Sequence, residues 1–170
     1  MNMSTPDSMP HTDAIVDVRK LWTAFGEGDR QVVIHKDLDL TITRGEVLTL
    51  VGGSGTGKTV LLRQMLGLES PYRGEVEVLG RPASELGRVG AASRVGMLFQ
   101  QGALFSAFTV LENIAFPLRE LKIFPPELIN DAALVKLQMV GLGPEHANKM
   151  PADLSGGIIK RVALARALSM

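Results

Sequence analysis

The chain has 170 residues, enough for one ordinary domain with a sizeable core, and it carries 18 acidic and 18 basic side chains. Its formal net charge of zero gives no reason to expect nucleic acid as the main partner, because nucleic-acid binders usually show a basic face or tail. The absence of cysteine excludes disulfides and thiolate metal sites, and it suits a reducing compartment.

The first elements are a tail and a hairpin. Residues 1–13 are polar and contain proline, which predicts a disordered tail and not a signal peptide. No apolar run is long enough to cross a bilayer, so we expect a cytoplasmic protein. The stretches 14–22 and 31–43 have alternating or β-branched character, and a turn signal at 26–29 joins them. This pattern predicts an antiparallel hairpin.

A glycine-rich segment follows, flanked by an apolar run at 47–51 and a helical pattern at 60–66. The spacing is that of a phosphate loop, and the flanks predict the buried strand and the helix that such a loop needs. Its residues are Gly52, Gly53, Ser54, Gly55, Thr56, Gly57, Lys58 and Thr59.

Each residue type in this loop suits a nucleotide triphosphate. The glycines let successive N–H groups line an anion site, and the helix that follows adds the positive end of its dipole. Lys58 supplies a charge for the β and γ phosphates, and the Thr59 hydroxyl is placed to ligate magnesium. The expected ligand is Mg-ATP or Mg-GTP.

Further strands and a helical layer are predicted downstream. Alternation predicts a strand at 75–79, and a short apolar run predicts another at 95–99. Apolar residues at helical spacing then predict two helices, within 111–118 and 128–142, separated by the pair Pro125 and Pro126.

The last segment, 154–168, predicts a helix with Ser155 as its N-cap. Gly156 and Gly157 leave the first N–H groups open, so this helix start is either a second anion site or an ordinary capped end. The three histidines, at 11, 35 and 146, lack metal-ligand spacing and are interpreted as structural or solvated.

The phosphate loop, the Leu154 to Gly157 signature and the run from Arg161 to Leu168 together resemble the nucleotide-binding domain of ABC transporters, over nearly the whole chain after Asp13. The resemblance implies an α/β P-loop NTPase fold of ABC type, with a mixed β core, an antiparallel N-terminal β subdomain and an α-helical subdomain. It also implies four segments. These are the tail at 1–13, the nucleotide-binding core at 14–100, the helical subdomain at 101–153 and the signature helix at 154–170.

The resemblance implies further site residues. Ser155, Gly156 and Gly157 would close over ATP held by the phosphate loop of a second subunit, so that a homodimer sandwiches two nucleotides. Gln100 matches the glutamine that reaches magnesium and the attacking water. Phe25 matches the aromatic that stacks on adenine, with Trp22 as the competing choice and a packing role open for either.

Residues 96–105, 109–110 and 112–120, with the aliphatic Ile158, most resemble the ATPases of the Mla and Mce lipid transport systems. The resemblance implies a protein on the cytoplasmic face of the inner membrane that energises phospholipid or other lipid transport. Its partners would be an integral-membrane permease, docked near 107–117, and a periplasmic lipid-binding Mce-domain protein. Coupling would run through 101–151.

The sequence departs from the family at Met170, before the magnesium-binding aspartate, the catalytic glutamate and the switch histidine. We therefore expect an incomplete record of a longer ATPase, with residues 1–170 inactive and poorly stable alone. Two alternatives are a non-hydrolysing nucleotide-binding module and a soluble ABC ATPase that is not a transporter. The second would be expected to show a basic insertion or tandem cassettes, and neither is found in the sequence.

Overall fold

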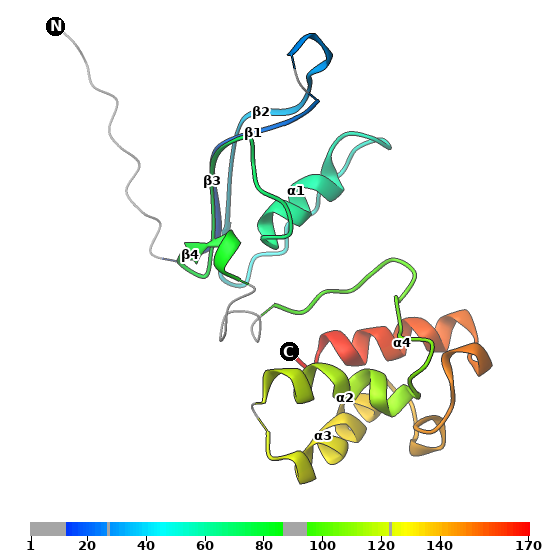
Figure 1. Ribbon diagram of the computed structural model, residues 1–170. Coiled ribbons are helices and arrows are strands. Elements are labelled where there is room, and N and C mark those ends of the chain that lie inside the picture. The colour runs from blue at the N-terminus through cyan, green and yellow to red at the C-terminus, as the bar shows by residue number, and fades with distance from the viewer. Residues whose placement is uncertain (1–12, 27, 87–94, 123) are drawn as a thin grey trace, which may run out of the picture. The chain divides into compact units, whose positions relative to one another are not determined.

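The computed structural model describes residues 13–26, 28–86, 95–122 and 124–170. The chain divides into two compact units, 1–88 and 89–170 (Figure 1). The predicted tail lies outside the described residues except for Asp13. The boundaries predicted at 100 and 153 stay predictions.

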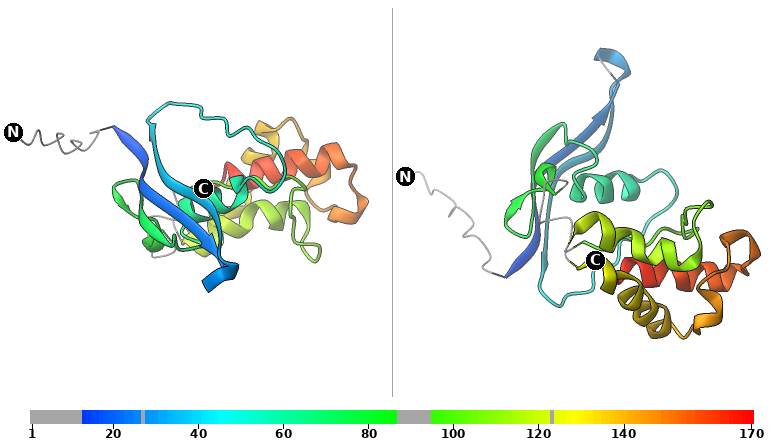
Figure 2. Two further views of the ribbon diagram at one scale, coloured as in Figure 1. Left: turned by 90° about the horizontal axis from the view of Figure 1, so that it is seen from above. Right: turned by 60° about the horizontal axis from the view of Figure 1, so that its bottom comes forward.

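The first unit is built on the hairpin that the sequence predicts. Strand β1 (Ala14–Phe25) pairs antiparallel with β2 (Val32–Thr43), and Figure 2 shows the two strands running side by side. On its other edge β1 pairs antiparallel with β3 (Arg73–Val78), which pairs with the short β4 (Arg81–Pro82). The order is β2-β1-β3-β4. Short 3-10 turns follow β1 and β4, at Gly28–Arg30 (η1) and Ala83–Glu85 (η2).

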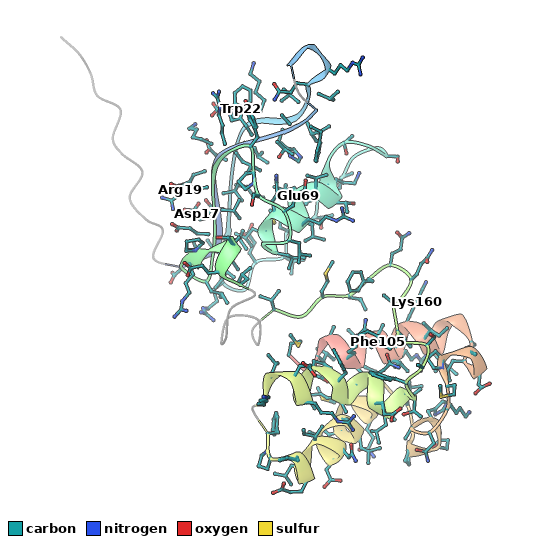
Figure 3. All side chains as sticks on the ribbon, viewed as in Figure 1. Asp17, Arg19, Trp22, Glu69, Phe105 and Lys160 are labelled. Atoms are coloured by element: carbon teal, nitrogen blue, oxygen red, sulfur yellow. The ribbon has the colours of Figure 1, made fainter. Side chains whose placement is uncertain are left out.

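The two faces of this sheet differ in chemistry. Val18 and Leu21 of β1 are buried, and helix α1 (Lys58–Met65) lies against β3 with its own Leu61 and Met65 buried. Asp17 and Arg19 project from the opposite face (Figure 3), where Arg19 pairs with Glu77 at 2.7 Å and Asp17 at 3.4 Å. Alternation along β1, shifted by the irregularity at Lys20 that brings Val18 and Leu21 to the same face, therefore sets α1 and the loop that precedes it on the apolar face.

Two predicted strands are not strands in the structure. The runs 47–51 and 95–99 are extended segments without strand pairing, and Val47 and Val51 are 92% and 89% exposed. An apolar run has strand propensity, but a strand forms only when a neighbour accepts and donates its backbone hydrogen bonds. In the part of the chain that the structure describes, the sheet offers these runs no such neighbour. The predicted burial of 47–51 is therefore wrong.

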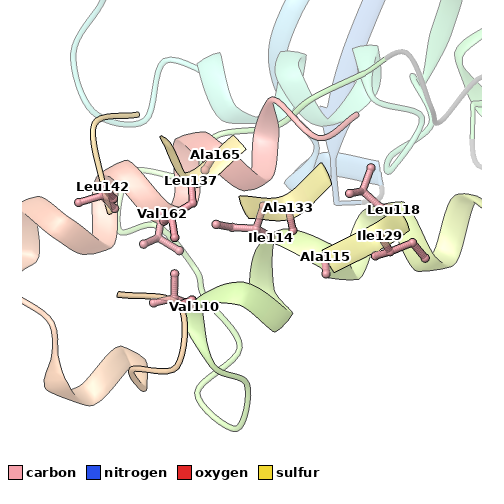
Figure 4. Packing of buried hydrophobic residues seen from close by; sticks show 11 residues of the cluster. Val110, Ile114, Ala115, Leu118, Ile129, Ala133, Leu137, Leu142, Val162 and Ala165 are labelled. Atoms are coloured by element: carbon pink, nitrogen blue, oxygen red, sulfur yellow. The ribbon is translucent and has the colours of Figure 1, made fainter. Parts of the chain in front are cut away.

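The second unit is helical, as predicted. It contains α2 (Val110–Leu121), α3 (Pro126–Met139) and α4 (Gly156–Ala167), with 3-10 turns η4 (Pro144–His146) and η5 (Pro151–Asp153) between the last two. All three helices contribute to one apolar core, shown in Figure 4, in which Ile114, Leu137 and Val162 are completely buried.

Local chemistry marks the helix ends. Thr109 and Glu112 form a reciprocal capping box at the start of α2, in which the Thr109 hydroxyl accepts from the Glu112 N–H at 3.2 Å. Pro126 occupies the first turn of α3, as the sequence predicts, and Gly141 follows the helix with a φ of 74°. In the ranges that the structure describes, no helix is long and apolar enough to span a membrane.

Candidate functional site

The glycine-rich loop leads directly into the N-terminus of α1. Gly57 is the N-cap residue, with a φ of 87°, and no side chain caps the helix. The first helical hydrogen bond runs from the Leu61 N–H to the Gly57 carbonyl at 2.9 Å, so the N–H groups of the first turn have no acceptor within the helix. No acidic residue lies in this turn. The arrangement leaves a positive helix end available to an anion.

Lys58 adds a cation at the same place. Its ammonium donates to the carbonyl oxygens of Gly52 at 2.8 Å and Gly53 at 2.5 Å, and it lies 3.1 Å from the Thr56 hydroxyl. Thr56 in turn donates to the Gly53 carbonyl at 3.0 Å. The loop is therefore closed around the lysine, and a phosphate oxygen that binds the ammonium would replace one of these three loop acceptors.

A cavity of about 290 Å³ opens on the loop and connects it to the hairpin. It is lined by residues 54–60 together with Phe25 and Ile34. Phe25 is 45% exposed. Trp22 is not among the lining residues, and its ring instead lies under the Lys36 ammonium at 5.6 Å. Of the two aromatics that the sequence left open, only Phe25 borders the phosphate loop, and its role against adenine stays a prediction.

The floor under the loop is partly polar, which the sequence did not predict. A Cβ on Gly57 would clash with Cγ2 of Ile34 and stand 2.6 Å from Nε2 of His35, so the loop closes directly on β2. His35 Nδ1 lies 2.9 Å from the hydroxyl of the buried Thr23, and burial lowers the pKa of His35. The sequence placed His35 in a strand but gave no sign of what it would contact.

Gln100 lies in the second unit, exposed in a turn ahead of a well-anchored segment. Arg166 of α4 donates to the carbonyl oxygens of Gly102 and Ala103, both at 2.8 Å, and its guanidinium lies 5.9 Å from the Phe105 ring. The backbone just after Gln100 is therefore fastened to α4. Nothing in the sequence around Arg166 indicates that its side chain would anchor a distant backbone segment.

Asn113 provides a second anchor for this segment, and sequence reasoning missed it too. The side chain is completely buried on α2. Its Oδ1 accepts from the Phe105 N–H at 2.8 Å, and its Nδ2 donates to the carbonyls of Phe105, Phe108 and Thr109 at 3.0 to 3.1 Å. One amide thus satisfies the backbone of the turn that leads into α2.

The second helix start has the form that the sequence predicts. Ser155 is the N-cap residue of α4, and its side chain makes no capping hydrogen bond. Gly156 and Gly157 are exposed, and a Cβ on either would meet open space. The hydroxyl of Ser155 and the first N–H groups of α4 can therefore face a partner. The phosphate loop and Phe25 belong to the first unit, and Gln100 and this helix start belong to the second.

A comparison with protein families matches residues 35–170 to the family described as "ABC transporter". The chain is 40% identical over 159 residues to the intermembrane phospholipid transport system ATP-binding protein MlaF of Haemophilus influenzae, covering 92% of this chain and 58% of that protein. It is also 40% identical over 158 residues to the probable ribonucleotide transport ATP-binding protein mkl of Mycobacterium leprae, covering 90% and 44%. The chain therefore spans about half the length of these curated relatives.

Solved structures agree with the family match. The dimeric structure of a post-hydrolysis state of the ATP-binding cassette MJ0796, bound to ADP and Pi, matches with a TM-score of 0.78 and 31% identity, over 91% of this chain and 69% of that one. The structure of cbiO1 from Clostridium perfringens, part of the ABC transporter complex cbiONQ, matches with a TM-score of 0.75 and 28% identity, over 92% and 62%. The fold is thus the α/β P-loop fold of ABC cassettes, and the chain belongs to the ABC transporter family.

Proposed function

We propose that this chain is the ATP-binding part of an ABC transporter subunit, with the triphosphate held by residues 52–59. The observation that carries the proposal is the uncapped N-terminus of α1 with the Lys58 ammonium beside it. Unpaired N–H groups, a cation and hydroxyls are the donor set that phosphate oxygens require. The residues present therefore fit a nucleotide triphosphate.

The individual roles follow from position. The glycines at 52, 53, 55 and 57, with Ser54 and Thr56, shape the loop whose N–H groups face the phosphates. Lys58 neutralises charge on the β and γ phosphates, and the Thr59 hydroxyl would hold Mg²⁺, which would supply positive charge for phosphoryl transfer. Phe25 stacks on the base, and adenine is supported by the ADP bound to the similar MJ0796 cassette.

The same proposal gives the second unit a role across a homodimer. Ser155, Gly156 and Gly157 of one copy would face the phosphate loop of the other, and Gln100 would help to hold Mg²⁺ and the attacking water. Support comes from the free Ser155 hydroxyl, the open space around the two glycines and the dimeric state of the similar cassette. ATP hydrolysis is assigned to the whole protein, and nucleotide binding and positioning to residues 13–170.

For the cargo, we propose phospholipid or a related lipid. The names of the two curated relatives differ, one giving phospholipid and the other ribonucleotide, at equal identity. The sequence pattern at 96–105 and 109–120 supports the lipid transport systems. The protein would then work at the cytoplasmic face of the inner membrane with an integral-membrane permease and a periplasmic lipid-binding Mce-domain protein.

Nucleotide binding is tested directly by titrating Mg-ATP into the purified protein by calorimetry. We expect Lys58→Ala to weaken binding at least tenfold, since it removes the cation from the loop. Lys20→Ala is the control, because Lys20 makes a surface ion pair with Asp39 in the same unit. Equal affinity of wild type and Lys58→Ala would refute the assignment of the loop.

The cargo is tested with the whole transporter in vesicles, where stimulation of ATP hydrolysis by ribonucleotide and not by phospholipid would refute the lipid proposal.

A further inference from the structure

A chain of side-chain hydrogen bonds lies under the phosphate loop and joins both strands of the hairpin to α1. Nδ1 of His35 on β2 lies 2.9 Å from Oγ1 of Thr23 on β1, and the Thr23 hydroxyl donates to Oε1 of Gln64 on α1 at 3.0 Å. Thr23 and Gln64 are each 1% exposed. Thr23 and His35 are cross-strand partners in the β1–β2 ladder, so strand register itself sets the first contact.

With Oε1 of Gln64 turned toward Thr23, as in the structure, the direction of these bonds sets the tautomer of His35. The Thr23 hydroxyl has a single proton, and it is donated to Gln64. The bond between Thr23 and His35 therefore needs a proton on Nδ1 of the imidazole, which leaves Nε2 of the neutral ring as an acceptor. Burial, which lowers the pKa of His35, favours this neutral ring.

The acceptor nitrogen lies against the start of α1. Nε2 is 2.6 Å from the place where a Cβ on Gly57 would stand, and Gly57 is the N-cap residue of the helix. The N-terminus of a helix carries partial positive charge, so a lone pair beside it is favourable and a protonated nitrogen there is not. Two hydrogen bonds thus connect the Gln64 amide to the His35 ring, and the ring packs against the Gly57 turn.

Gln64 shows that this polar arrangement carries a cost to stability. Its Nε2 is buried and has no hydrogen-bond partner, and a leucine at that position would avoid the loss. Gln64 lies seven residues after Gly57, about two helical turns, so the contacts of Gly57 with His35 and of Gln64 with Thr23 fall on one face of α1. Two fixed points on one face set both the rotation and the height of the helix on the hairpin.

We infer that His35, Thr23 and Gln64 are positioning residues for the phosphate site, acting through Gly57 and the N-terminus of α1. They fix the orientation of the first-turn N–H groups and of Lys58 relative to the strand end that carries Phe25. The inference rests on the proposed function, because it gives the loop a phosphate to bind. His35 lies against the loop, Thr23 links His35 to Gln64 of the helix, and the loop contacts the ligand.

The test separates positioning from ordinary stability. Thr23→Val keeps the shape of the side chain and removes both hydrogen bonds, and Thr23→Ser keeps the hydroxyl. In the double variant Thr23→Val with Gln64→Leu, an apolar pair replaces the bond between Thr23 and Gln64, which is nearly neutral for folding, and only His35 Nδ1 loses its partner. We expect the Kd for Mg-ATP to rise about three- to tenfold in Thr23→Val and in the double variant, and to recover in Thr23→Ser.

Stability is followed in parallel through Trp22 fluorescence in urea. We expect the unfolding midpoint to fall in Thr23→Val and to return toward wild type in the double variant, while the Kd stays raised. Thr41→Val is the matched control, because it removes a similar hydrogen bond, from Thr41 to Asp17 at 3.1 Å, elsewhere in the same hairpin. If the affinity of the double variant recovers with its midpoint, the three residues serve stability alone and the inference is overturned.

A spectroscopic measurement tests the inference independently of nucleotide. In protein labelled with ¹⁵N-histidine, we expect His35 to be the Nδ1–H tautomer, with the signal assigned by its loss in His35→Phe. The Nε2–H tautomer would overturn the inference. If Lys58→Ala and wild type bind Mg-ATP equally, the proposed function fails. The inference can still be tested without nucleotide, by the His35 tautomer and by hydrogen exchange of the Gly57 N–H in Thr23→Val, which report whether the chain of hydrogen bonds orders the loop.

Discussion

Two glycines of the phosphate loop differ in their surroundings. Replacing each with alanine should separate the cost of a left-handed backbone from the cost of a steric clash. Gly55 and Gly57 have nearly the same φ, 82° and 87°. A Cβ on Gly55 would meet nothing within 4 Å, whereas one on Gly57 would clash with Ile34 Cγ2 and stand 2.6 Å from His35 Nε2. The backbone penalty is therefore shared, and the steric penalty falls on Gly57 alone.

The magnitudes follow from these surroundings. A left-handed conformation costs a residue with a Cβ about 1–2 kcal/mol, and this is the whole expected loss for Gly55→Ala. Gly57→Ala should lose about 1–3 kcal/mol more, because the added methyl group overpacks the contact with β2. The entropy that alanine removes from the unfolded chain is the same in both variants and cancels in the difference.

The assay is urea unfolding followed by Trp22 fluorescence. Trp22 is the only tryptophan in the chain and lies on β1, so its signal reports on the first unit. Equal unfolding midpoints for Gly55→Ala and Gly57→Ala would refute the reasoning, since they would mean that the loop does not close on β2. As a further check, Ile34→Ala should cost less in the Gly57→Ala background than alone, because it removes the nearest clashing atom.

Three further predictions concern the second unit. Asn113→Leu leaves the Phe105 N–H and the Phe108 carbonyl without their side-chain partner, whereas the Phe105 and Thr109 carbonyls keep the N–H groups of Phe108 and Asn113, and we expect a loss of about 2–4 kcal/mol in unfolding free energy, measured by circular dichroism in urea. Hydrogen bonds from the Thr109 N–H and hydroxyl hold the pKa of Glu112 below its usual 4.5, so the stability they contribute is present above that value and is lost as pH falls through the lowered pKa. Melting curves between pH 3 and 7 should show this loss in wild type and a smaller one in Glu112→Gln. Arg166→Lys cannot donate to two carbonyls in a fixed fork, and we expect hydrogen exchange of residues 102–105 to accelerate at least tenfold while α3 is unchanged.

Much of the fold could be predicted because its signals are local. Alternation along the hairpin, the proline at the start of α3, and the serine and glycines at the start of α4 each specify their element without help from distant residues. The phosphate loop is of the same kind, since its spacing alone indicates the turn and the helix that follows. The family resemblance added the expected contact of Gln100 with magnesium and of Ser155 with a second subunit, which no local signal supplies.

The errors and omissions depend on contacts between distant segments. The run 47–51 has strand composition, yet a strand is a property of a pair, and composition cannot supply the neighbour. The contact between Thr23 and Gln64 joins residues 41 apart, and Arg166 reaches carbonyls more than 60 residues away. A polar residue in an otherwise apolar pattern, such as Gln64 in α1, is the one signal that could have led to the buried chain of hydrogen bonds under the loop.

Arg166 fastens the backbone that follows Gln100 to helix α4. Its two hydrogen bonds grip adjacent carbonyls, and Gly102 sits so close to α4 that a Cβ there would stand 2.9 Å from Ile159 Cγ2. A rotation of α4 therefore pulls this backbone with it, with little slack to absorb the displacement. We therefore expect a displacement of α4, which begins after Ser155, to be transmitted through Arg166 to the backbone beside Gln100.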